Sequence, residues 1–268
     1  MNLRDRVAVV TGGSSGMGWG AAAGLADAGC RVAILARSAE RASERAEKIG
    51  AIAVRCDVAD ASSVEAAFEQ VERTLGVASV LVHAAADGST ATLLDADGRA
   101  GSLETLQQIV QTNLVGTLLV AREMSSRMVR GNASGRVATG LIVNVSSIGA
   151  ADGVVGAAYA ASKGGVDALT LSLARELSPW CIRVVTIAPG AIDTEMLRSG
   201  ATPETWAVIA GQALSTRRAG TPAEFAALVR HLAENDYLNG CVIRFDSGMR
   251  IPYSFGLGGG MQSPGEAS

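Results

Sequence analysis

Short runs of apolar residues alternate with longer alanine-rich patterns along most of this chain. The short runs, rich in Val, Ile and Ala, lie at residues 6–10, 31–35, 51–58, 79–85, 141–147, 181–190 and 239–248. The longer patterns, with helical periodicity, lie between them at residues 18–29, 39–50, 62–76, 102–129 and 159–179. Such alternation is typical of a parallel sheet that is covered by helices on both faces. We therefore predict an α/β fold with one doubly wound sheet of seven strands.

The chain is expected to form a single domain of the Rossmann type. Its 268 residues, 48% of them hydrophobic, are enough to bury one sizeable core. No linker, internal repeat or charge run divides the sequence. We place the domain at residues 1–253 and a glycine-rich tail at residues 254–268. Within the domain, the pattern at residues 87–102 is irregular.

Composition and charge exclude several classes of partner. A net charge of -3 without a block of Lys or Arg gives no footprint for nucleic acid, and no apolar run approaches the roughly 18 residues that span a bilayer. Two histidines alone cannot make a three-ligand metal site. The four cysteines lie far apart without a CxxC pair, which favours buried thiols in a reducing compartment. We predict no metal, nucleic-acid or membrane partner and, because the first residues lead directly into a strand, a cytoplasmic location.

A glycine-rich turn joins the first predicted strand to the first predicted helix, with the sequence TGGSSGMG from Thr11 to Gly18. Glycines let the backbone approach a phosphate closely, and a helix N-terminus supplies free N–H groups and partial positive charge. The strand before the turn and the helix after it favour dinucleotide binding over a chance match. The candidate cofactor-binding residues of this loop are Gly12, Ser14, Ser15, Gly16, Met17 and Gly18.

A further candidate for the cofactor site is Asp57-Val58, at the end of the third predicted strand. The carboxyl ends of parallel strands meet at one edge of the sheet, where an adenine would lie. The alternative is that Asp57 only caps the helix that follows.

The candidate catalytic residues include Tyr159 and Lys163 of the segment YAASK. Four residues apart on a helix, they share a face, so their side-chain tips can converge. An adjacent ammonium favours a phenolate, and we expect Lys163 to lower the pKa of Tyr159 toward neutral pH. Such pairs also occur on ordinary surface helices. The neighbouring strand ends favour chemistry here, because the hydroxyls of NVSS and the turn APG lie at the same edge of the sheet.

Together these motifs resemble the short-chain dehydrogenase/reductase family over essentially the whole chain. The resemblance rests on the glycine loop, Asn113 in QTNLVG, the serines of NVSS, the YAASK segment, and Pro189-Gly190 with Thr194. It implies an oxidoreductase that moves a hydride between a nicotinamide cofactor and a secondary alcohol or ketone. Within the family, residues 87–102 and the segment ENDYLNGCVIRFDSGMRI are similar to 3-hydroxyacyl-CoA dehydrogenases that also act on hydroxysteroids.

The resemblance implies a catalytic tetrad that needs no metal. Tyr159 would be the acid and base, Lys163 would lower its pKa and bind the nicotinamide ribose, and Asn113 would position a water for proton relay. A serine would orient the substrate carbonyl. The N-x-x-S pattern of the strand gives Ser147, whereas the common spacing of thirteen residues before the tyrosine gives Ser146. Adjacent strand residues face opposite sides, and we choose Ser147 because the strand fixes its geometry.

The resemblance also places residues beside the cofactor at the ends of the fourth and sixth strands. These are Ala84, Ala85, Pro189, Gly190, Ile192 and Thr194. His83 stands where the family commonly has asparagine. We expect a structural histidine with satisfied hydrogen bonds at this position rather than a catalytic group.

The end of the second strand bears on the choice between NAD(H) and NADP(H). An acid there binds the adenosine ribose and repels a 2′-phosphate, whereas a nearby arginine accommodates that phosphate. Here Ala36 takes the acidic position, Arg37 and Ser38 follow, and a guanidinium offers a planar fork of donors to a phosphate. The alternative is a solvated Arg37 that pairs with Glu40 or Glu44, and the similar subfamily prefers NAD. We favour NADP(H) over NAD(H).

The resemblance favours a 3-hydroxyacyl-CoA or 3-ketoacyl-CoA substrate, with hydroxysteroids or other free ketones as the alternative. Residues 87–102 and the helical stretch PETWAVIAGQAL would wall the substrate pocket. A different alternative is a nucleotide-binding sensor or scaffold without turnover, which a complete tetrad argues against. Two predicted helices, QQIVQTNLVGTLLVAREM and YAASKGGVDALTLSLA, carry more apolar surface than one sheet face can cover, so we expect a homotetramer.

Overall fold

The computed structural model describes residues 1–89, 91–95, 97–133, 139–153, 156–199 and 202–250. The tail predicted at residues 254–268 lies outside these ranges, as do two residues of the 87–102 loop. The domain boundary at residue 253 therefore stays a prediction.

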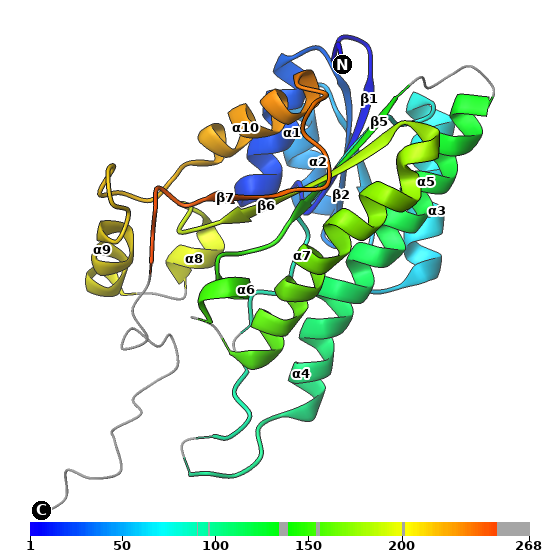
Figure 1. The fold of residues 1–268 in the computed structure, drawn as a ribbon. Coiled ribbons are helices and arrows are strands. Elements are labelled where there is room, and N and C mark those ends of the chain that lie inside the picture. Colours follow the sequence, from blue (N-terminus) through cyan, green and yellow to red (C-terminus); the bar gives the residue numbers. More distant parts are fainter. Residues whose placement is uncertain (90, 96, 134–138, 154–155, 200–201, 251–268) are drawn as a thin grey trace, which may run out of the picture.

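Seven parallel strands form one sheet in the order β3-β2-β1-β4-β5-β6-β7 (Figure 1). Each strand overlaps a predicted apolar run, which confirms the doubly wound α/β fold. The runs are almost continuously apolar because both faces of an all-parallel sheet are buried. The strands are β1 Val7–Thr11, β2 Arg31–Ala36, β3 Ile52–Arg55, β4 Val80–His83, β5 Gly140–Val145, β6 Ile182–Pro189 and β7 Val242–Phe245.

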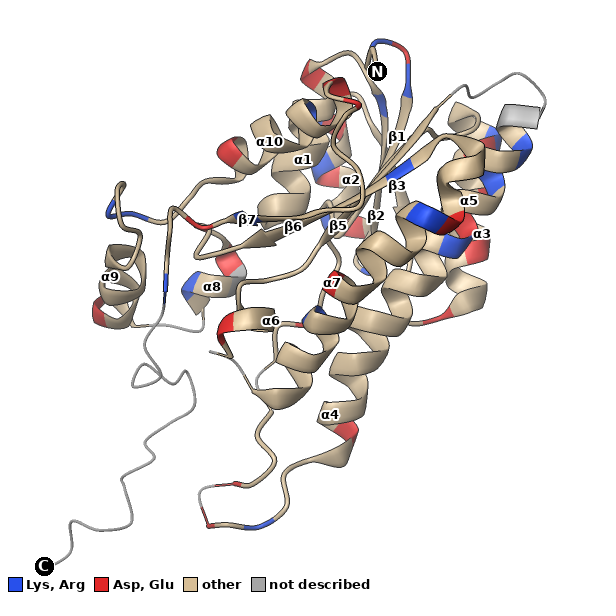
Figure 2. Cartoon of the chain, in the orientation of Figure 1, with Lys and Arg blue, Asp and Glu red and all other residues tan. Residues whose placement is uncertain are grey.

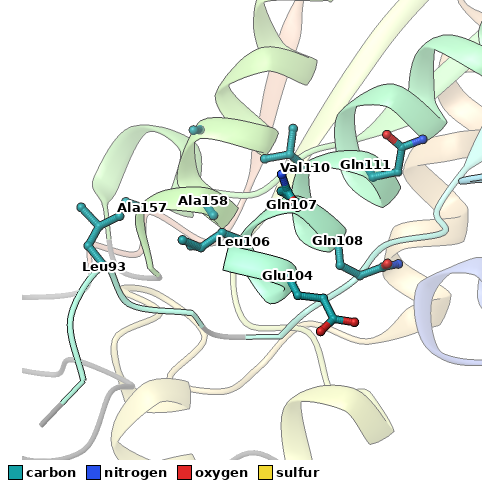
Figure 3. Close-up of a pocket in the computed structure, with 10 residues that line it drawn as sticks. Leu93, Glu104, Leu106, Gln107, Gln108, Val110, Gln111, Ala157 and Ala158 are labelled. Atoms are coloured by element: carbon teal, nitrogen blue, oxygen red, sulfur yellow. The ribbon is translucent and has the colours of Figure 1, made fainter. Parts of the chain in front are cut away.

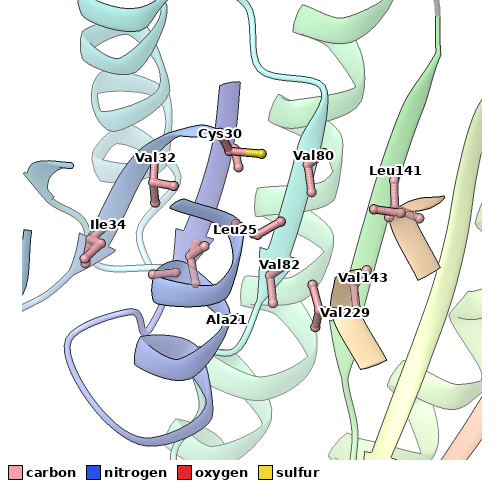
Figure 4. Packing of buried hydrophobic residues seen from close by; sticks show 14 of the residues in the cluster. Ala21, Leu25, Cys30, Val32, Ile34, Val80, Val82, Leu141, Val143 and Val229 are labelled. Carbon is pink, nitrogen blue, oxygen red and sulfur yellow. The ribbon is translucent and has the colours of Figure 1, made fainter. Parts of the chain in front are cut away.

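Helices cover the sheet on both faces, with α1, α2 and α10 on one side and α3, α5 and α7 on the other (Figure 1). Successive residues of β1 show the division, because Ala8 and Val10 enter the first core and Val7 and Val9 the second. Figure 4 shows the first core, where Leu25 of α1 packs among strand residues. The helix bounds are α1 Gly16–Asp27, α2 Ala39–Glu47, α3 Ala61–Leu75, α5 Gly116–Ala133, α7 Ala157–Leu177 and α10 Pro222–Glu234.

One predicted helix is interrupted. The stretch 102–129, expected as a single helix, instead forms α4 (Leu103–Val110), a π-helical turn (Gln111–Val115) and then α5. A π turn adds one residue to a helical turn and is found mostly at functional sites. The candidate residue Asn113 lies inside this turn.

The periodicity predicts α9 (Pro203–Gly211) but not α6 (Gly149–Asp152), α8 (Glu195–Ser199) or α10. The start of α10 carries a recognisable signal, a capping box in which Thr221 and Glu224 each satisfy a backbone amide of the other. α6 and α8 are each about one turn long, too short for a periodic pattern.

The topology gathers the candidate residues at one edge of the sheet. β1 and β4 lie side by side where the strand order reverses, and ligands of such sheets bind beyond the carboxyl ends of the strands at that point.

Figure 2 shows acidic and basic residues interspersed over helices and loops in this view. Within the described ranges, no helix has both the length and the apolar character needed to cross a membrane.

Candidate active site

The glycine loop after β1 is shaped by contacts that only glycine permits. Gly12 has a φ of 65°, and a methyl group there would lie 2.8 Å from the amide nitrogen of Ala85. A methyl group on Gly18 would overlap the carbonyl oxygen of Gly12. Ser14 lies half-buried between them. The loop is therefore folded against its own helix and against the end of β4, which brings the predicted residues Ala84 and Ala85 beside it.

The N-terminus of α1 is open to an anion. Ser15 is the N-cap, but within the described chain its side chain makes no capping hydrogen bond, and the first turn contains no acidic residue. The amides of Gly16, Met17 and Gly18 and the helix dipole favour a negative group here. Thr194 faces the loop, since a methyl group on Gly16 would lie 3.0 Å from its Cγ2. These residues fit the pyrophosphate of a dinucleotide.

Arg37 is exposed at the end of β2, directly after the buried Ala36. Among the described residues its guanidinium forms no ion pair with Glu40 or Glu44, so the structure does not contain the pairing that was the alternative for Arg37. Ser38 is the N-cap of α2, and its hydroxyl accepts a hydrogen bond from the helix backbone at 3.4 Å. The preference for a 2′-phosphate stays a prediction, with Arg37 placed where it could meet one.

A second guanidinium lies on the same side of the site, and sequence reasoning missed it. Arg41 of α2 pairs with Glu195 of α8 at 2.6 Å. Because Glu195 directly follows Thr194, this pair connects the β2 side of the site with the β6 side. The spacing Arg37-x-x-x-Arg41 was the signal that could have found it, since it places a second arginine in the first turn of the helix that follows Arg37.

Asp57 does not cap α3. Its Oδ1 accepts a hydrogen bond from the amide of Ala59 at 3.0 Å, and its own amide donates to the hydroxyl of Ser63 at 2.9 Å. The N-cap of α3 is Asp60, whose side chain accepts from the first turn. The alternative in which Asp57 is the cap is therefore wrong. A contact of Asp57 and the buried Val58 with adenine stays a prediction.

α7 brings Tyr159 and Lys163 to one face at the carboxyl edge of the sheet. The Nζ of Lys163 lies 5.9 Å from the centroid of the Tyr159 ring and donates to the carbonyl oxygen of Val145 at 2.9 Å. The Tyr159 side chain is hydrogen-bonded to Ser147. Ser146 is buried, and its hydroxyl donates to the carbonyl oxygen of Lys163 at 3.1 Å. The structure thus places Ser147, and not Ser146, beside the phenol.

Burial sets the protonation of both side chains. Burial raises the pKa of Tyr159, and the hydrogen bond with Ser147 opposes that rise. Burial also lowers the pKa of Lys163 to about 8, while the charge of Asp167 opposes that fall. The expected lowering of the tyrosine pKa is wrong for this structure, because burial raises the pKa by more than the hydrogen bond with Ser147 lowers it. The phenol is therefore protonated at neutral pH.

Asn113 ties the loop after β4 to α7. Its Oδ1 accepts from the amide of Asp87 at 2.7 Å, and its Nδ2 donates to the carbonyl oxygen of Asp87 at 3.0 Å and to the hydroxyl of Ser162 at 3.1 Å. The hydroxyl of Thr117 donates to the Asn113 carbonyl oxygen at 2.6 Å. The side chain is thus fully engaged in positioning protein segments. The water-positioning role of Asn113 stays a prediction.

His83 ends β4 and is buried. Its Nδ1 lies 2.8 Å from the hydroxyl of Thr11, which also accepts from the amide of Ala85 at 3.3 Å. Burial and the charge of Lys163 lower the pKa of His83 to about 3, so the ring is neutral. Its Nε2 has no partner among the described residues. The expectation of a satisfied histidine therefore holds for one ring nitrogen only.

The segment after β6 faces the glycine loop from the other side. Pro189 ends the strand, the amide of Gly190 donates to the carbonyl oxygen of Phe245 at 3.0 Å, and Ile192 is buried. The hydroxyl of Thr194 accepts from the first turn of α8 at 3.4 Å. In the described part of the chain, no group of three or more His, Cys, Asp and Glu side chains could hold a metal ion.

A groove of about 850 Å³ lies between α4 and the start of α7 (Figure 3). No tetrad residue is among the described side chains that line it. The 87–102 loop contributes Leu93, whereas α9 packs elsewhere, with Ile209 in a cluster around Ile148, next to Ser147. The two segments expected to wall one pocket thus contact different parts of the molecule. The groove is lined by Leu93, Glu104, Leu106, Gln107, Gln108, Val110, Gln111, Ala157, Ala158 and Ala161.

Comparison with known proteins agrees with this geometry. The family profile described as short chain dehydrogenase matches residues 6–204. The human 3-hydroxyacyl-CoA dehydrogenase type-2 is 36% identical over 255 residues, which cover 93% of this chain and 97% of that protein. The 3-oxoacyl-[acyl-carrier-protein] reductase MabA of Mycobacterium bovis is 36% identical over 248 residues, which cover 91% and 93%.

A solved structure extends the similarity to three dimensions. The 3-hydroxyacyl-CoA dehydrogenase type-2 from Mycobacterium avium matches with a TM-score of 0.84 at 33% identity, over 92% of this chain and 97% of that one. The profile match covers most of the domain, and the relatives match it almost end to end. The chain therefore belongs to the short-chain dehydrogenase family, and it is an oxidoreductase of the kind that uses a nicotinamide cofactor.

Proposed function

We propose that this protein interconverts a 3-hydroxyacyl-CoA and a 3-ketoacyl-CoA with NADP(H). The observation that carries the proposal is the cluster of Ser147, Tyr159 and Lys163 at the carboxyl edge of the sheet, beside a glycine loop shaped for a pyrophosphate. The names of the relatives support the substrate class, since two act on hydroxyacyl-CoA and a third on an oxoacyl group carried by a protein.

The three side chains divide the work of carbonyl reduction. When bound, the nicotinamide supplies the hydride or accepts it in the reverse direction. Ser147 donates a hydrogen bond to the substrate carbonyl oxygen, and Tyr159 gives its proton to that oxygen as the alcohol forms. A protonated phenol at neutral pH is the form this step needs. Lys163 stabilises the phenolate that remains, because an ammonium near a phenol favours the charged form.

The preference for NADP(H) rests on charge at the end of β2. Ala36 offers no carboxylate to repel a 2′-phosphate, and Arg37 is exposed beside it. Arg37 adds positive charge to this side, which favours a phosphate over a hydroxyl, while Arg41 is paired with Glu195. The free carboxylates of Glu40 and Glu44 do not pair with Arg37 within the described ranges.

The substrate and cofactor are tested together in steady-state assays of the full-length protein. We expect reduction of acetoacetyl-CoA with NADPH, with a kcat/KM at least about tenfold above that with NADH. Turnover of free ketones or hydroxysteroids alone would favour the second candidate and remove the acyl-CoA assignment. Tight NADPH binding without turnover of any ketone would identify a binding protein instead of an enzyme.

Assembly as a homotetramer is proposed from the outer faces of the long helices. Leu118 on α5 is 40% exposed and Leu171 on α7 is 47% exposed, and Leu106 and Val110 line the neighbouring groove. A second copy of the chain would cover this apolar surface. We expect a tetrameric mass in light scattering at micromolar protein, and a monomeric mass would contradict the proposal.

A cytoplasmic location is proposed from the cysteines. All four thiols are free, with Cys30 and Cys56 buried. Burial raises the pKa of both, to about 11 for Cys30 and about 12 for Cys56, which keeps them as inert thiols. Free thiols are typical of a reducing compartment. Fractionation of cells that make the protein tests the location directly.

A further inference from the structure

The carboxylate of Asp167 lies on the same helix as the proposed catalytic residue Lys163. Asp167 follows Lys163 by four residues on α7, so the two share one face of the helix. Asp167 is half-buried, and its Oδ1 is shielded from solvent without a hydrogen-bond partner among the described residues. The hydroxyl of Ser146 donates to the carbonyl oxygen of Lys163 at 3.1 Å and lies close enough to Asp167 to lower the pKa of that carboxyl group. The tetrad chemistry assigns Asp167 no role.

A shielded carboxylate oxygen without a partner is destabilising unless a positive charge compensates it. Lys163 is that charge: burial raises the pKa of Asp167 and the charge of Lys163 opposes that rise, while burial lowers the pKa of Lys163 and the charge of Asp167 opposes that fall. Within the described chain the two form no direct ion pair, and the Nζ of Lys163 donates to the carbonyl oxygen of Val145 at 2.9 Å. They therefore act on each other through space, in an interior where charges are poorly screened.

The other titratable groups near the ammonium carry no charge at neutral pH. His83 faces it from β4 and is neutral, because burial and Lys163 itself lower its pKa to about 3. Tyr159 faces it from α7 with a protonated phenol, because burial raises its pKa. Among the described residues, Asp167 is thus the negative charge that acts on Lys163.

We propose that Asp167 is a positioning residue, the internal counter-ion that keeps the buried Lys163 ammonium charged while Tyr159 gives up its proton. A neutral lysine could not stabilise the phenolate, and burial alone drives the lysine toward neutrality. Ser146 donates to the backbone carbonyl oxygen of Lys163, which ties α7 to the end of β5 next to this pair. The inference rests on the proposed role of Lys163 in the tetrad.

The composition of the chain makes a direct test possible, because Lys48 and Lys163 are its only two lysines. The full-length protein is produced with lysine labelled by an NMR-active isotope at the carbon next to the ammonium, and both signals are followed against pH. Lys48 is exposed at the end of α2 and is the internal reference. In the wild type we expect the Lys163 signal to titrate at about 8. In Asp167→Asn it moves to lower pH by roughly one unit, while the Lys48 signal stays.

Three variants control this test. Asp167→Ser removes the same charge with a smaller side chain and gives the same downward shift, so the result does not depend on one variant that folds poorly. Asp167→Glu restores the carboxylate and returns the titration toward the wild-type pH. Asp27→Asn removes an exposed carboxylate at the end of α1 and leaves the Lys163 signal where it was.

A folded Asp167→Asn protein whose Lys163 signal titrates at the wild-type pH would overturn the proposal. The pH profile of kcat gives a second readout, because the alkaline limb of Asp167→Asn moves to lower pH with its lysine. A uniform loss of kcat with an unmoved limb indicates a purely structural role and also overturns it. The lysine titration needs neither cofactor nor substrate, so it decides the counter-ion even if the proposed acyl-CoA activity fails.

Discussion

The glycine loop and the face of α7 with Tyr159 and Lys163 meet at one edge of the sheet, yet they are built in different ways. The loop depends on backbone, because Gly12 and Gly18 leave no space for a side chain and the helix amides supply the donors. The α7 face depends on buried side chains, whose positions are set by bonds such as that from Lys163 to Val145. The loop side of the site thus depends on the absence of side chains, and the α7 side depends on the functional groups of its side chains.

This difference predicts two kinds of failure. At Gly12 or Gly18 of the loop, any new side chain overlaps neighbouring backbone atoms, whatever its chemistry. We expect such a substitution to weaken cofactor binding before it affects the chemical step. Removal of the Tyr159 or Ser147 hydroxyl on the other side takes away a functional group and leaves the fold and cofactor binding intact. The comparison is contradicted if a loop substitution lowers turnover without weakening cofactor binding, or if loss of an α7 hydroxyl weakens cofactor binding.

The largest effect is expected for Tyr159→Phe, which removes only the hydroxyl. Without a proton donor at the substrate oxygen, kcat should fall by at least about a thousandfold. The NADPH dissociation constant, measured by fluorescence titration, should stay within about twofold of wild type. A variant that keeps a substantial part of its kcat, or that loses the cofactor, would show that the phenol is not the proton donor.

Ser146 and Ser147, which follow β5, allow two adjacent hydroxyls to be compared. Ser147→Ala removes the hydroxyl beside Tyr159 and should lower kcat by about a hundredfold. Ser146→Ala, its matched control, removes a hydroxyl that donates to the backbone carbonyl oxygen of Lys163 and should cost far less. Steady-state kinetics of both variants under one set of conditions decide the order. The reverse order would place the substrate next to Ser146.

Gly18→Ala tests the loop by adding a single methyl group. Because that group would overlap the carbonyl oxygen of Gly12, we expect NADPH binding to weaken by about thirtyfold and the melting temperature to fall. Gly211→Ala is the control, since a methyl group at the end of α9 meets no atom within 4 Å. Equal NADPH affinity in both variants would show that the loop does not contact the cofactor.

The smallest effect is expected for Arg37→Ala, which removes the predicted partner of the NADPH 2′-phosphate. Arg37→Ala should raise the Michaelis constant for NADPH by about tenfold, which corresponds to about 1.4 kcal/mol of binding, and should leave that for NADH almost unchanged. Arg45→Ala is the matched control, because Arg45 lies on α2 after Arg37 but its guanidinium stacks on the Trp19 ring at 5.0 Å. An unchanged NADPH constant in Arg37→Ala would show that this arginine meets only solvent.

The sheet and the places of Tyr159, Lys163 and Ser147 in it could be predicted because their signals are local. Apolar runs marked every strand, and the spacing of Tyr159 and Lys163 placed them on one helix face. The strand pattern that selected Ser147 agrees with the structure, which puts its hydroxyl against the phenol. In each of these cases, the spacing or periodicity of neighbouring residues was enough to predict where a strand or side chain lies.

The rest depends on burial and on contacts between distant segments. The π turn around Asn113 changes the helical phase by one residue, which an apolar pattern does not register. The pKa of Tyr159 moves in the opposite direction to the one expected, because the degree of burial is a property of the fold. Arg41 meets Glu195 across 154 positions of sequence, and no local pattern contains that pairing.

The central claim is that this site transfers a hydride to a ketone while Tyr159 supplies the proton. The most direct test mixes the full-length protein with acetoacetyl-CoA and NADPH that carries deuterium at the transferable position, and analyses the product by mass spectrometry. We predict 3-hydroxybutyryl-CoA with deuterium on the former carbonyl carbon from the wild type, and no product from Tyr159→Phe although that variant binds the cofactor. Unlabelled product from the wild type, or labelled product in equal amount from Tyr159→Phe, would contradict the claim.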